Sequence, residues 1–249
     1  TVKSSYEGEE GYWVLWAKKV HAYTDVLRHF GGSFDYFFFG DDDSYLRVDM
    51  LRLYLRTLAS DSRPLYAGRK LRDPHSGLMF NTGAGYVLNR LALRRLVGVL
   101  EAERRDGYSR CMAPPGTDGQ REEDIPREGV TRTHNGTADR FTATCLASVG
   151  VFPADTRDCR GKERFHHLSP EQAYAHQPTQ KVVNGTLFVD QMSACSVDFR
   201  PGEEGVSIDS VLFHWMTDPL YVAEVHAYLR LCRGNAVKEG LVEGIRDEL

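Results

Sequence analysis

The stretch FDYFFFGDDDSY, residues 34–45, is the most informative part of this chain. Its aromatic half, residues 34–40, is typical of a buried strand, because aromatic side chains fit a pleated and packed surface. The carboxylates of Asp41, Asp42 and Asp43 follow directly where that strand ends. Hard divalent cations prefer oxygen ligands, and ligands of α/β sheets commonly bind at strand ends, so the triplet predicts a metal site for a phosphorylated substrate. An acidic turn that caps the next helix is the alternative, since Asp is also favoured in turns and at N-caps.

On either side of this stretch, apolar residues recur at helical spacing in some segments and in continuous runs in others, which predicts an α/β fold in one continuous domain. Small residues in Phe80–Leu88 indicate a loop that joins an apolar segment and lets a backbone approach closely. Residues 104–137 are polar and predict a loop insertion. We expect helices near 12–30, 49–58, 89–101, 142–149 and 219–232, with Asp49, Asn89 and Asp218 at their starts and Gly150 as a C-terminal cap, and strands near 34–40, 64–68 and 211–213.

Length and composition are ordinary for a globular protein, with 249 residues and 41% hydrophobic content. The formal net charge of -4 and the sequence pI near 6.1 provide no basic field for nucleic acid, so nucleic-acid binding is disfavoured. No run approaches the ~18 apolar residues of a membrane span, and the start of the chain has neither an apolar signal core nor an initiating Met. Either a targeting segment lies upstream of Thr1 or there is none.

Cysteines and glycosylation motifs bear on the compartment. Asn135-Gly136-Thr137 and Asn184-Gly185-Thr186 are formal N-glycosylation acceptors, and together they favour a secretory compartment, where disulfides persist. The chain has no CxxC pair, which disfavours a zinc ribbon and a thioredoxin-type motif. Two bridges and one free thiol are compatible with the five cysteines, which are Cys111, Cys145, Cys159, Cys195 and Cys232.

Four segments, taken in order, carry a resemblance to a known family: FDYFFFGDDDSY, FNTGAGYVL, DTRDCRGKERFHHLSPE and VLFHWMTDPLYVAEVHAYL. They resemble the core 1 β1,3-galactosyltransferase branch of the inverting β1,3-glycosyltransferase family, which also includes fringe-type enzymes. The match runs from about Trp13 to Leu231. The acidic triplet and the Gly-Ala-Gly segment are shared widely in that superfamily, whereas residues 155–171 look like the core 1 branch in particular.

The resemblance implies a GT-A fold, a mixed sheet flanked by helices, and transfer of galactose from UDP-galactose to O-linked N-acetylgalactosamine with Mn²⁺ as cofactor. On the matching positions, Asp41, Asp43 and His214 would ligate the metal. Two carboxylates and an imidazole suit Mn²⁺, which also takes phosphate oxygens. Asp41 and Asp42 would also lie at the nucleotide. Lys18 would join them, because Lys18 and its neighbour Lys19 occupy the place of a basic helix in the family.

The sugar or acceptor side would be lined by Gly83, Ala84 and Gly85. Trp215 or Phe165 would stack on a sugar face, although either residue type is more often part of a core.

The family's catalytic carboxylate lies in a Glu-Asp motif that opens a helix ending in a Cys-Leu pair. Counting back from Cys145-Leu146 places Ala138-Asp139 on that motif, so the resemblance implies Asp139 as the base that takes the acceptor proton. The motif's Glu is Ala138 here, and Glu122-Glu123-Asp124 lies upstream as a rival acidic cluster. That cluster is followed by Pro126 and lacks a downstream Cys-Leu pair, so it is interpreted as a solvated charge run. An ordinary first-turn Asp is the alternative for Asp139.

The resemblance also implies an N-terminally truncated domain, because roughly forty residues precede the triplet where a GT-A fold supplies two or more strands. We therefore expect residues 1–249 to form one GT-A-like catalytic domain, from a type II membrane protein of the Golgi lumen. A glycoprotein or glycopeptide acceptor, a homodimer and a Cys111–Cys145 bridge are further expectations. A fringe-like β1,3-N-acetylglucosaminyltransferase and an inactive transferase-like chaperone are the alternatives.

Overall fold

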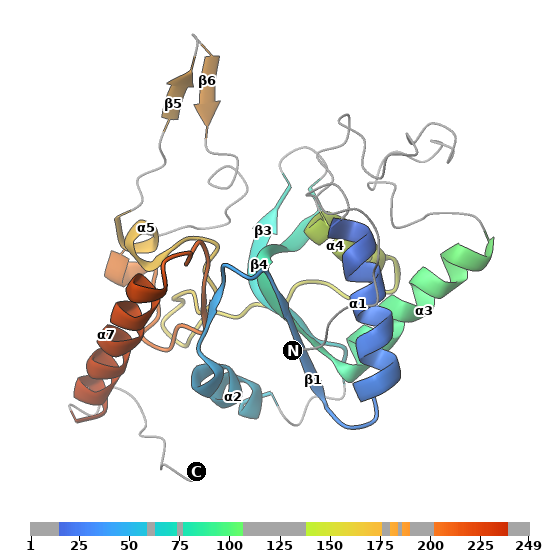
Figure 1. Ribbon diagram of the computed structural model, residues 1–249, viewed down its shortest axis with the longest axis horizontal. Helices are drawn as coiled ribbons and strands as arrows, with labels where there is room; N and C mark the ends of the chain where they lie inside the picture. The colour runs from blue at the N-terminus through green and yellow to red at the C-terminus, as the bar shows by residue number, and fades with distance from the viewer. Residues whose placement is uncertain are drawn as a thin grey trace.

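A three-stranded antiparallel sheet lies at the centre of the computed structural model, which describes residues 15–58, 63–73, 77–106, 138–175, 180–183, 186–189 and 202–238. Strand β4 (Met79–Asn89) is the middle strand, between β1 (Tyr36–Gly40) and β3 (Tyr66–Arg72) (Figure 1). In the β1–β4 register Gly40 lies opposite Gly85. The acidic triplet therefore leaves the sheet beside the middle of β4.

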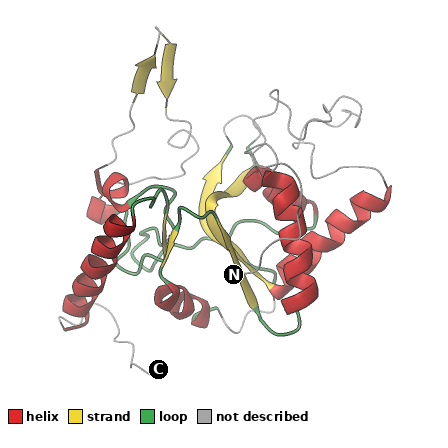
Figure 2. Cartoon of the chain, in the orientation of Figure 1, coloured by secondary structure: helices red, strands yellow, loops and turns green. Residues whose placement is uncertain are grey.

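The first face of the sheet is covered by α1 (Leu15–Phe30), α3 (Arg90–Asp106) and α4 (Ala138–Ser148) (Figure 2). Successive side chains of a strand point to opposite faces, and Tyr86 and Leu88 of β4 accordingly belong to the core beneath these helices. Helix α3 begins where expected, because the Asn89 side chain accepts a hydrogen bond from the Ala92 N–H at 2.9 Å. These helices and the sheet form the larger core.

The second face is covered by α2 (Val48–Arg56) and by C-terminal segments. Val87, between Tyr86 and Leu88, packs here with Met50 and Leu51 of α2. A short ladder joins β2 (Tyr45–Leu46) to β7 (Leu212–Phe213), and so connects the N-terminal and C-terminal parts of the chain. Beyond it lie α5 (Pro170–Ala175), the 3-10 helix η3 (Gly202–Glu204), α7 (Pro219–Lys238) and the hairpin β5 (Gln180–Val183) with β6 (Thr186–Val189), which extends away from the other elements (Figure 1).

The predicted α/β architecture, a sheet flanked by helices, is confirmed. The named strands pair antiparallel, while isolated parallel bridges connect Glu163 with Val206 and Phe165 with Leu212, so parallel and antiparallel pairing both occur. Gly150 closes α4 with a φ of 72°, as expected for a glycine cap. The Asp218 side chain accepts a hydrogen bond from the Leu220 N–H at 2.9 Å, and α7 begins at Pro219.

Two local predictions were wrong. Residues 80–85 are not a loop but part of β4, because the small residues allow neighbouring side chains to pack closely on a continuous strand. Asp49 is not the N-cap of α2, since the helix starts earlier and Arg47 occupies that position without a side-chain cap bond. Of the predicted insertion, residues 104–106 end α3 and residues 107–137 lie outside the described part. In that described part, no helix is both long and apolar enough to cross a membrane.

Candidate metal centre

Two carboxylates and an imidazole from opposite ends of the chain meet at the end of β1. His214 Nε2 lies 3.0 Å from Asp43 Oδ1 and 3.9 Å from Asp41 Oδ2. One ligand atom from each of the three residues lies within 4.8 Å of the other two. Oxygen ligands about 2.0–2.1 Å from a cation such as Mg²⁺ are themselves about 3–4 Å apart, so this spacing fits ligands that share one ion. The structure thus brings together the three predicted ligands.

Backbone hydrogen bonds hold the two halves of this cluster together. The β2–β7 ladder pairs Tyr45 with Phe213, the residue before His214. On the other side of the imidazole, the Met216 N–H donates to the Asp43 carbonyl at 2.8 Å. The strand pairing before His214 and the hydrogen bond after it both fix the backbone of this residue. The side chain is therefore directed at the acidic turn by more than one contact.

Asp41 is the residue of the cluster whose pKa is shifted from its ordinary value. Burial raises the pKa of the Asp41 carboxyl, and the negative charges of Asp139 and Asp43 add to this effect, whereas the charges of Lys19 and His214 oppose it. The charge of the predicted base, Asp139, is thus one of those that affect the pKa of Asp41. Asp42 is exposed and is not part of the three-residue cluster.

Asp139 lies in the first turn of α4, where the partial positive charge of a helix N-terminus stabilises an anionic side chain. The Arg140 N–H donates to Asp139 Oδ1 at 3.0 Å. The Arg140 side chain in turn pairs with the buried Asp73, at 3.2 Å, and lies over the ring of Phe80. The start of α4 is therefore fixed against the sheet on the side of Arg140. The rival cluster, residues 122–124, lies outside the described residues.

Lys19 is a site residue that the sequence analysis mentioned only as the neighbour of Lys18. Its ammonium group lies 5.5 Å from the centroid of the Tyr86 ring and lowers the pKa of Asp41. Helical spacing could have found it, because Lys19 lies between the buried Trp16 and Tyr23 on the face of α1 that packs on the sheet. The role of Lys18 at the nucleotide stays a prediction.

Trp215 is exposed beside the cluster in an unusual backbone conformation. Its φ of 56° is the left-handed region, which bulky residues rarely adopt and which is often retained at functional sites. The indole stacks on His214 with ring centroids 5.5 Å apart, yet 43% of the residue's surface is accessible. Trp215 therefore presents an exposed indole beside the metal cluster, whereas Phe165, the other predicted stacking residue, is fully buried in the core.

The packing of two residues bears on the predicted lining by Gly83, Ala84 and Gly85, which stays a prediction. Ala84 is 1% exposed and belongs to the core on the second face of the sheet. A Cβ atom at Gly85 would lie 2.5 Å from the Phe38 ring and 2.9 Å from Leu212, so this glycine serves close packing. Neither side chain position offers surface to a sugar. The side-chain surroundings of Gly83 are outside the described part.

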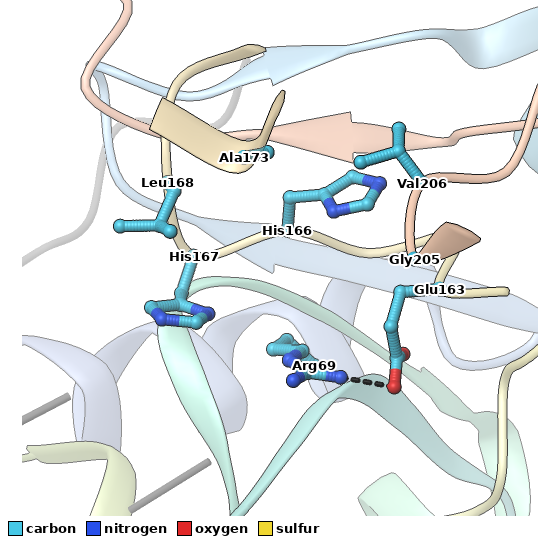
Figure 3. Close-up of a pocket in the computed structure, with 8 residues that line it drawn as sticks. All are labelled: Arg69, Glu163, His166, His167, Leu168, Ala173, Gly205 and Val206. Atoms are coloured by element: carbon cyan, nitrogen blue, oxygen red, sulfur yellow. Dashed lines mark ion pairs between the residues drawn. The ribbon is translucent and has the colours of Figure 1, made fainter. Parts of the chain in front are cut away.

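A buried ion pair lies behind the segment that holds His214. Arg69, at an irregularity of β3, pairs with Glu163, and both line a small pocket together with His166 and His167 (Figure 3). The next residue, Leu168, also lines the pocket and accepts a hydrogen bond from the His214 N–H at 3.1 Å. The Arg69–Glu163 pair thus supports the segment that holds the backbone of His214 in place.

The chain is similar to glycoprotein-N-acetylgalactosamine 3-beta-galactosyltransferase 1 of Xenopus laevis, with 27% identity over 220 residues. The resemblance to the core 1 branch is confirmed. The matched part is 88% of this chain and 52% of the frog protein, so the chain spans about half the length of that relative. No protein-family model matches the chain.

The cysteines agree in part with what the core 1 resemblance implied. Cys145 on α4 is disulfide-bonded, whereas Cys159 is free and exposed. The predicted partner Cys111 lies outside the described residues, so the Cys111–Cys145 pairing stays a prediction. The first glycosylation motif and Asn184 and Gly185 of the second also lie outside the described part.

Proposed function

We propose that the protein is an inverting β1,3-galactosyltransferase that moves galactose from UDP-galactose to O-linked N-acetylgalactosamine on glycoproteins. The observation that carries this proposal is the cluster of Asp41, Asp43 and His214, with Asp139 in electrostatic reach of it. The name of the frog relative supports the choice of galactose as the donor sugar and N-acetylgalactosamine as the acceptor sugar. The proposal also implies a glycoprotein acceptor and a location in the Golgi lumen.

The donor side of the site would consist of the cluster and the basic end of α1. Asp41, Asp43 and His214 would hold Mn²⁺, since a set of two carboxylates and one imidazole suits this ion better than a soft metal. When bound, Mn²⁺ would neutralise negative charge on the diphosphate of UDP. Lys19 would add a positive charge on the same side, and Lys18 and Asp42 would contact the nucleotide.

The acceptor side would be organised by Asp139 and Trp215. Asp139 would take the proton of the acceptor hydroxyl while that oxygen forms its bond to the anomeric carbon. The bond from the anomeric carbon to the UDP oxygen would break, its electron pair would leave with UDP, and attack from the opposite face would invert the configuration. Trp215, exposed and fixed beside His214, would stack on a sugar ring.

A transfer assay tests this function. The purified protein should convert UDP-galactose and an N-acetylgalactosaminyl peptide into the β1,3-linked disaccharide in the presence of Mn²⁺. Asp43→Ala and His214→Ala should each lower turnover by at least about a hundredfold, because each removes a ligand that neutralises the leaving group. Asp49→Asn is the matched control, since Asp49 is an exposed acidic residue on α2 outside the cluster.

The donor and the reaction class are tested in the same assay. If UDP-N-acetylglucosamine replaces UDP-galactose as the better donor, the protein is a fringe-like enzyme and the galactosyltransferase proposal is wrong. Full Mn²⁺-dependent transfer by Asp43→Ala would exclude the proposed metal centre. Absence of both Mn²⁺–UDP binding and transfer would favour a transferase-like chaperone.

A further inference from the structure

Three buried hydroxyl groups connect the sheet, α1 and the start of α4. Tyr86 of β4 contacts Tyr23 of α1 hydroxyl to hydroxyl, and Tyr23 Oη lies 2.8 Å from Thr142 Oγ1 of α4. Thr142 Oγ1 donates to the carbonyl of Ala138 at 2.8 Å. All three hydroxyl-bearing residues are fully shielded from solvent. Ala138, where this chain of hydrogen bonds ends, is the residue directly before Asp139.

The order of donors in this chain follows from the single hydrogen on each hydroxyl. Thr142 uses its hydrogen on the Ala138 carbonyl, so it accepts from Tyr23, and Tyr23 in turn accepts from Tyr86. Burial raises the pKa of both tyrosines well above the ordinary value, so each keeps its proton across the physiological pH range. The chain therefore runs in one direction, from the sheet to the first turn of α4.

The aromatic rings of the two tyrosines are themselves held in place. Tyr23 meets Phe39 edge to face with centroids 4.9 Å apart, and Tyr86 meets Tyr66 edge to face at 5.4 Å. Such pairs contribute about 0.5–1.5 kcal/mol each beyond buried area, so the hydroxyls are presented from fixed rings.

The same tyrosine links the start of α4 to the metal cluster. Tyr86 pairs with Phe39 in the β1–β4 ladder, and the adjacent pair is Gly85 with Gly40, the residue before Asp41. One residue of β4 thus fixes both the strand that presents Asp41 and, through two hydroxyls, the turn that presents Asp139.

We infer that Tyr86, Tyr23 and Thr142 are positioning residues that set the place of Asp139 relative to the metal ligands, an inference that rests on the proposed function of Asp139 as the base. None of the three touches the metal ligands. They act on the reaction through the backbone of Ala138, on one side of Asp139, while the Arg140–Asp73 pair holds the other side. A displacement of about 1 Å at a reacting group is enough to lower turnover by up to a hundredfold.

Removal of single hydroxyls tests this inference. Tyr23→Phe and Thr142→Val should lower kcat by about tenfold, with KM for UDP-galactose and the Mn²⁺–UDP affinity from calorimetry unchanged within about twofold. Thr142→Ser keeps the hydroxyl and should restore most of the turnover lost in Thr142→Val. Tyr54→Phe is the control, because Tyr54 is a buried tyrosine of α2 whose hydroxyl makes no hydrogen bond to any described residue.

A second measurement does not depend on activity. Amide hydrogen exchange along α4 should become faster in Tyr23→Phe and Thr142→Val, and should stay as in the wild type in Thr142→Ser and Tyr54→Phe. Equal exchange and equal kcat in all variants would overturn the inference, as would a kcat loss that Tyr54→Phe shares. A parallel loss of Mn²⁺–UDP affinity would also overturn it, since the hydroxyls would then support the fold as a whole.

Asp139→Asn separates this inference from the proposed function. If Asp139→Asn retains transfer, Asp139 is not the base and the proposed mechanism fails, whatever the exchange data show. If Asp139→Asn is inactive while Tyr23→Phe and Thr142→Val keep full kcat and full protection of α4, the mechanism stands and the positioning role is wrong.

Discussion

The imidazole of His166 lies flat against the ring of Phe213, with centroids 4.6 Å apart and an interplanar angle of 11°. Phe213 directly precedes the metal-ligand candidate His214, and His166 lines the pocket that Arg69 also lines (Figure 3). His166 is also within 2.9 Å of the Ser210 hydroxyl. The buried imidazole of His166 is therefore part of the packing that supports the metal centre.

The protonation of His166 should make stability depend on pH. Burial, with a smaller effect of the Arg69 charge, holds the pKa of His166 well below its usual value, so the folded state keeps the ring neutral. The unfolded chain binds a proton near pH 6.5, and the free energy of unfolding should therefore fall as the pH drops below that value, by up to about 1.4 kcal/mol per pH unit. Urea unfolding at pH 7.5, 6.5 and 5.5 measures this slope.

A variant pair isolates the contribution of His166. His166→Gln should be less stable at neutral pH and should lose part of the slope, whereas His29→Gln, at an exposed position on α1, should keep it. Identical slopes in the wild type and His166→Gln would show that other groups produce the acid sensitivity.

The Arg69–Glu163 pair should contribute more to stability than the exposed pairs do. Arg69 is 2% exposed and the Glu163 side chain 16%, so Arg69→Met leaves a carboxylate largely shielded from water without its partner. We expect a loss of about 3–5 kcal/mol in the free energy of unfolding, and partial recovery in the double variant Arg69→Met, Glu163→Gln. Arg157→Met, which breaks the exposed pair with Asp155, should cost less than about 1 kcal/mol, and a similar cost for both arginine variants would contradict this expectation.

Trp215→Gly should separate stability from activity. A glycine adopts a φ of 56° without strain, whereas a bulky residue there costs about 1–2 kcal/mol, so this variant should unfold at a temperature equal to or above that of the wild type. Loss of the exposed indole should raise KM for the acceptor or donor sugar by about tenfold. Phe152→Ala removes another exposed aromatic side chain and is the control; unchanged transfer kinetics in Trp215→Gly would remove Trp215 from the site.

Metal binding should be visible without any assay of transfer. At a concentration of Mn²⁺–UDP one hundred times its dissociation constant, the folded state gains about 2.7 kcal/mol, so the melting temperature should rise by several degrees. His214→Ala should abolish the rise and His29→Ala should keep it. A rise that persists in His214→Ala would place the ion elsewhere.

Much of the site was predictable because its residues occur in short, contiguous patterns. Asp41 and Asp43 follow an obvious strand, whereas His214 was assigned only because it matches a histidine position of the core 1 family. Lys19 was less visible, since a lysine on an apolar helical face is ordinarily assigned to solvent. The role of Tyr86 was hidden because FNTGAGYVL was interpreted as beginning with a loop.

The wrong predictions have a common physical cause. Ala84 and Gly85 were interpreted as a place for close approach of a ligand, and the close approach is real, but the neighbours are Phe38 and Leu212 of the protein itself. Small residues indicate that other atoms approach closely, but the sequence does not show whether those atoms belong to a ligand or to the protein. For Asp49, tertiary contacts of the preceding backbone moved the helix start, with the Arg47 N–H bonded to Val211.

The short β2–β7 ladder has a consequence for the order in which the protein is made. The β1–β4–β3 sheet uses neighbouring segments within residues 36–89, so the turn with Asp41 and Asp43 can form while the rest of the chain is still being synthesised. The imidazole of His214 joins the two carboxylates only when β7 pairs with β2. The growing chain would therefore expose an acidic turn that binds a cation weakly. Tight binding of a cation would be acquired among the last events of folding.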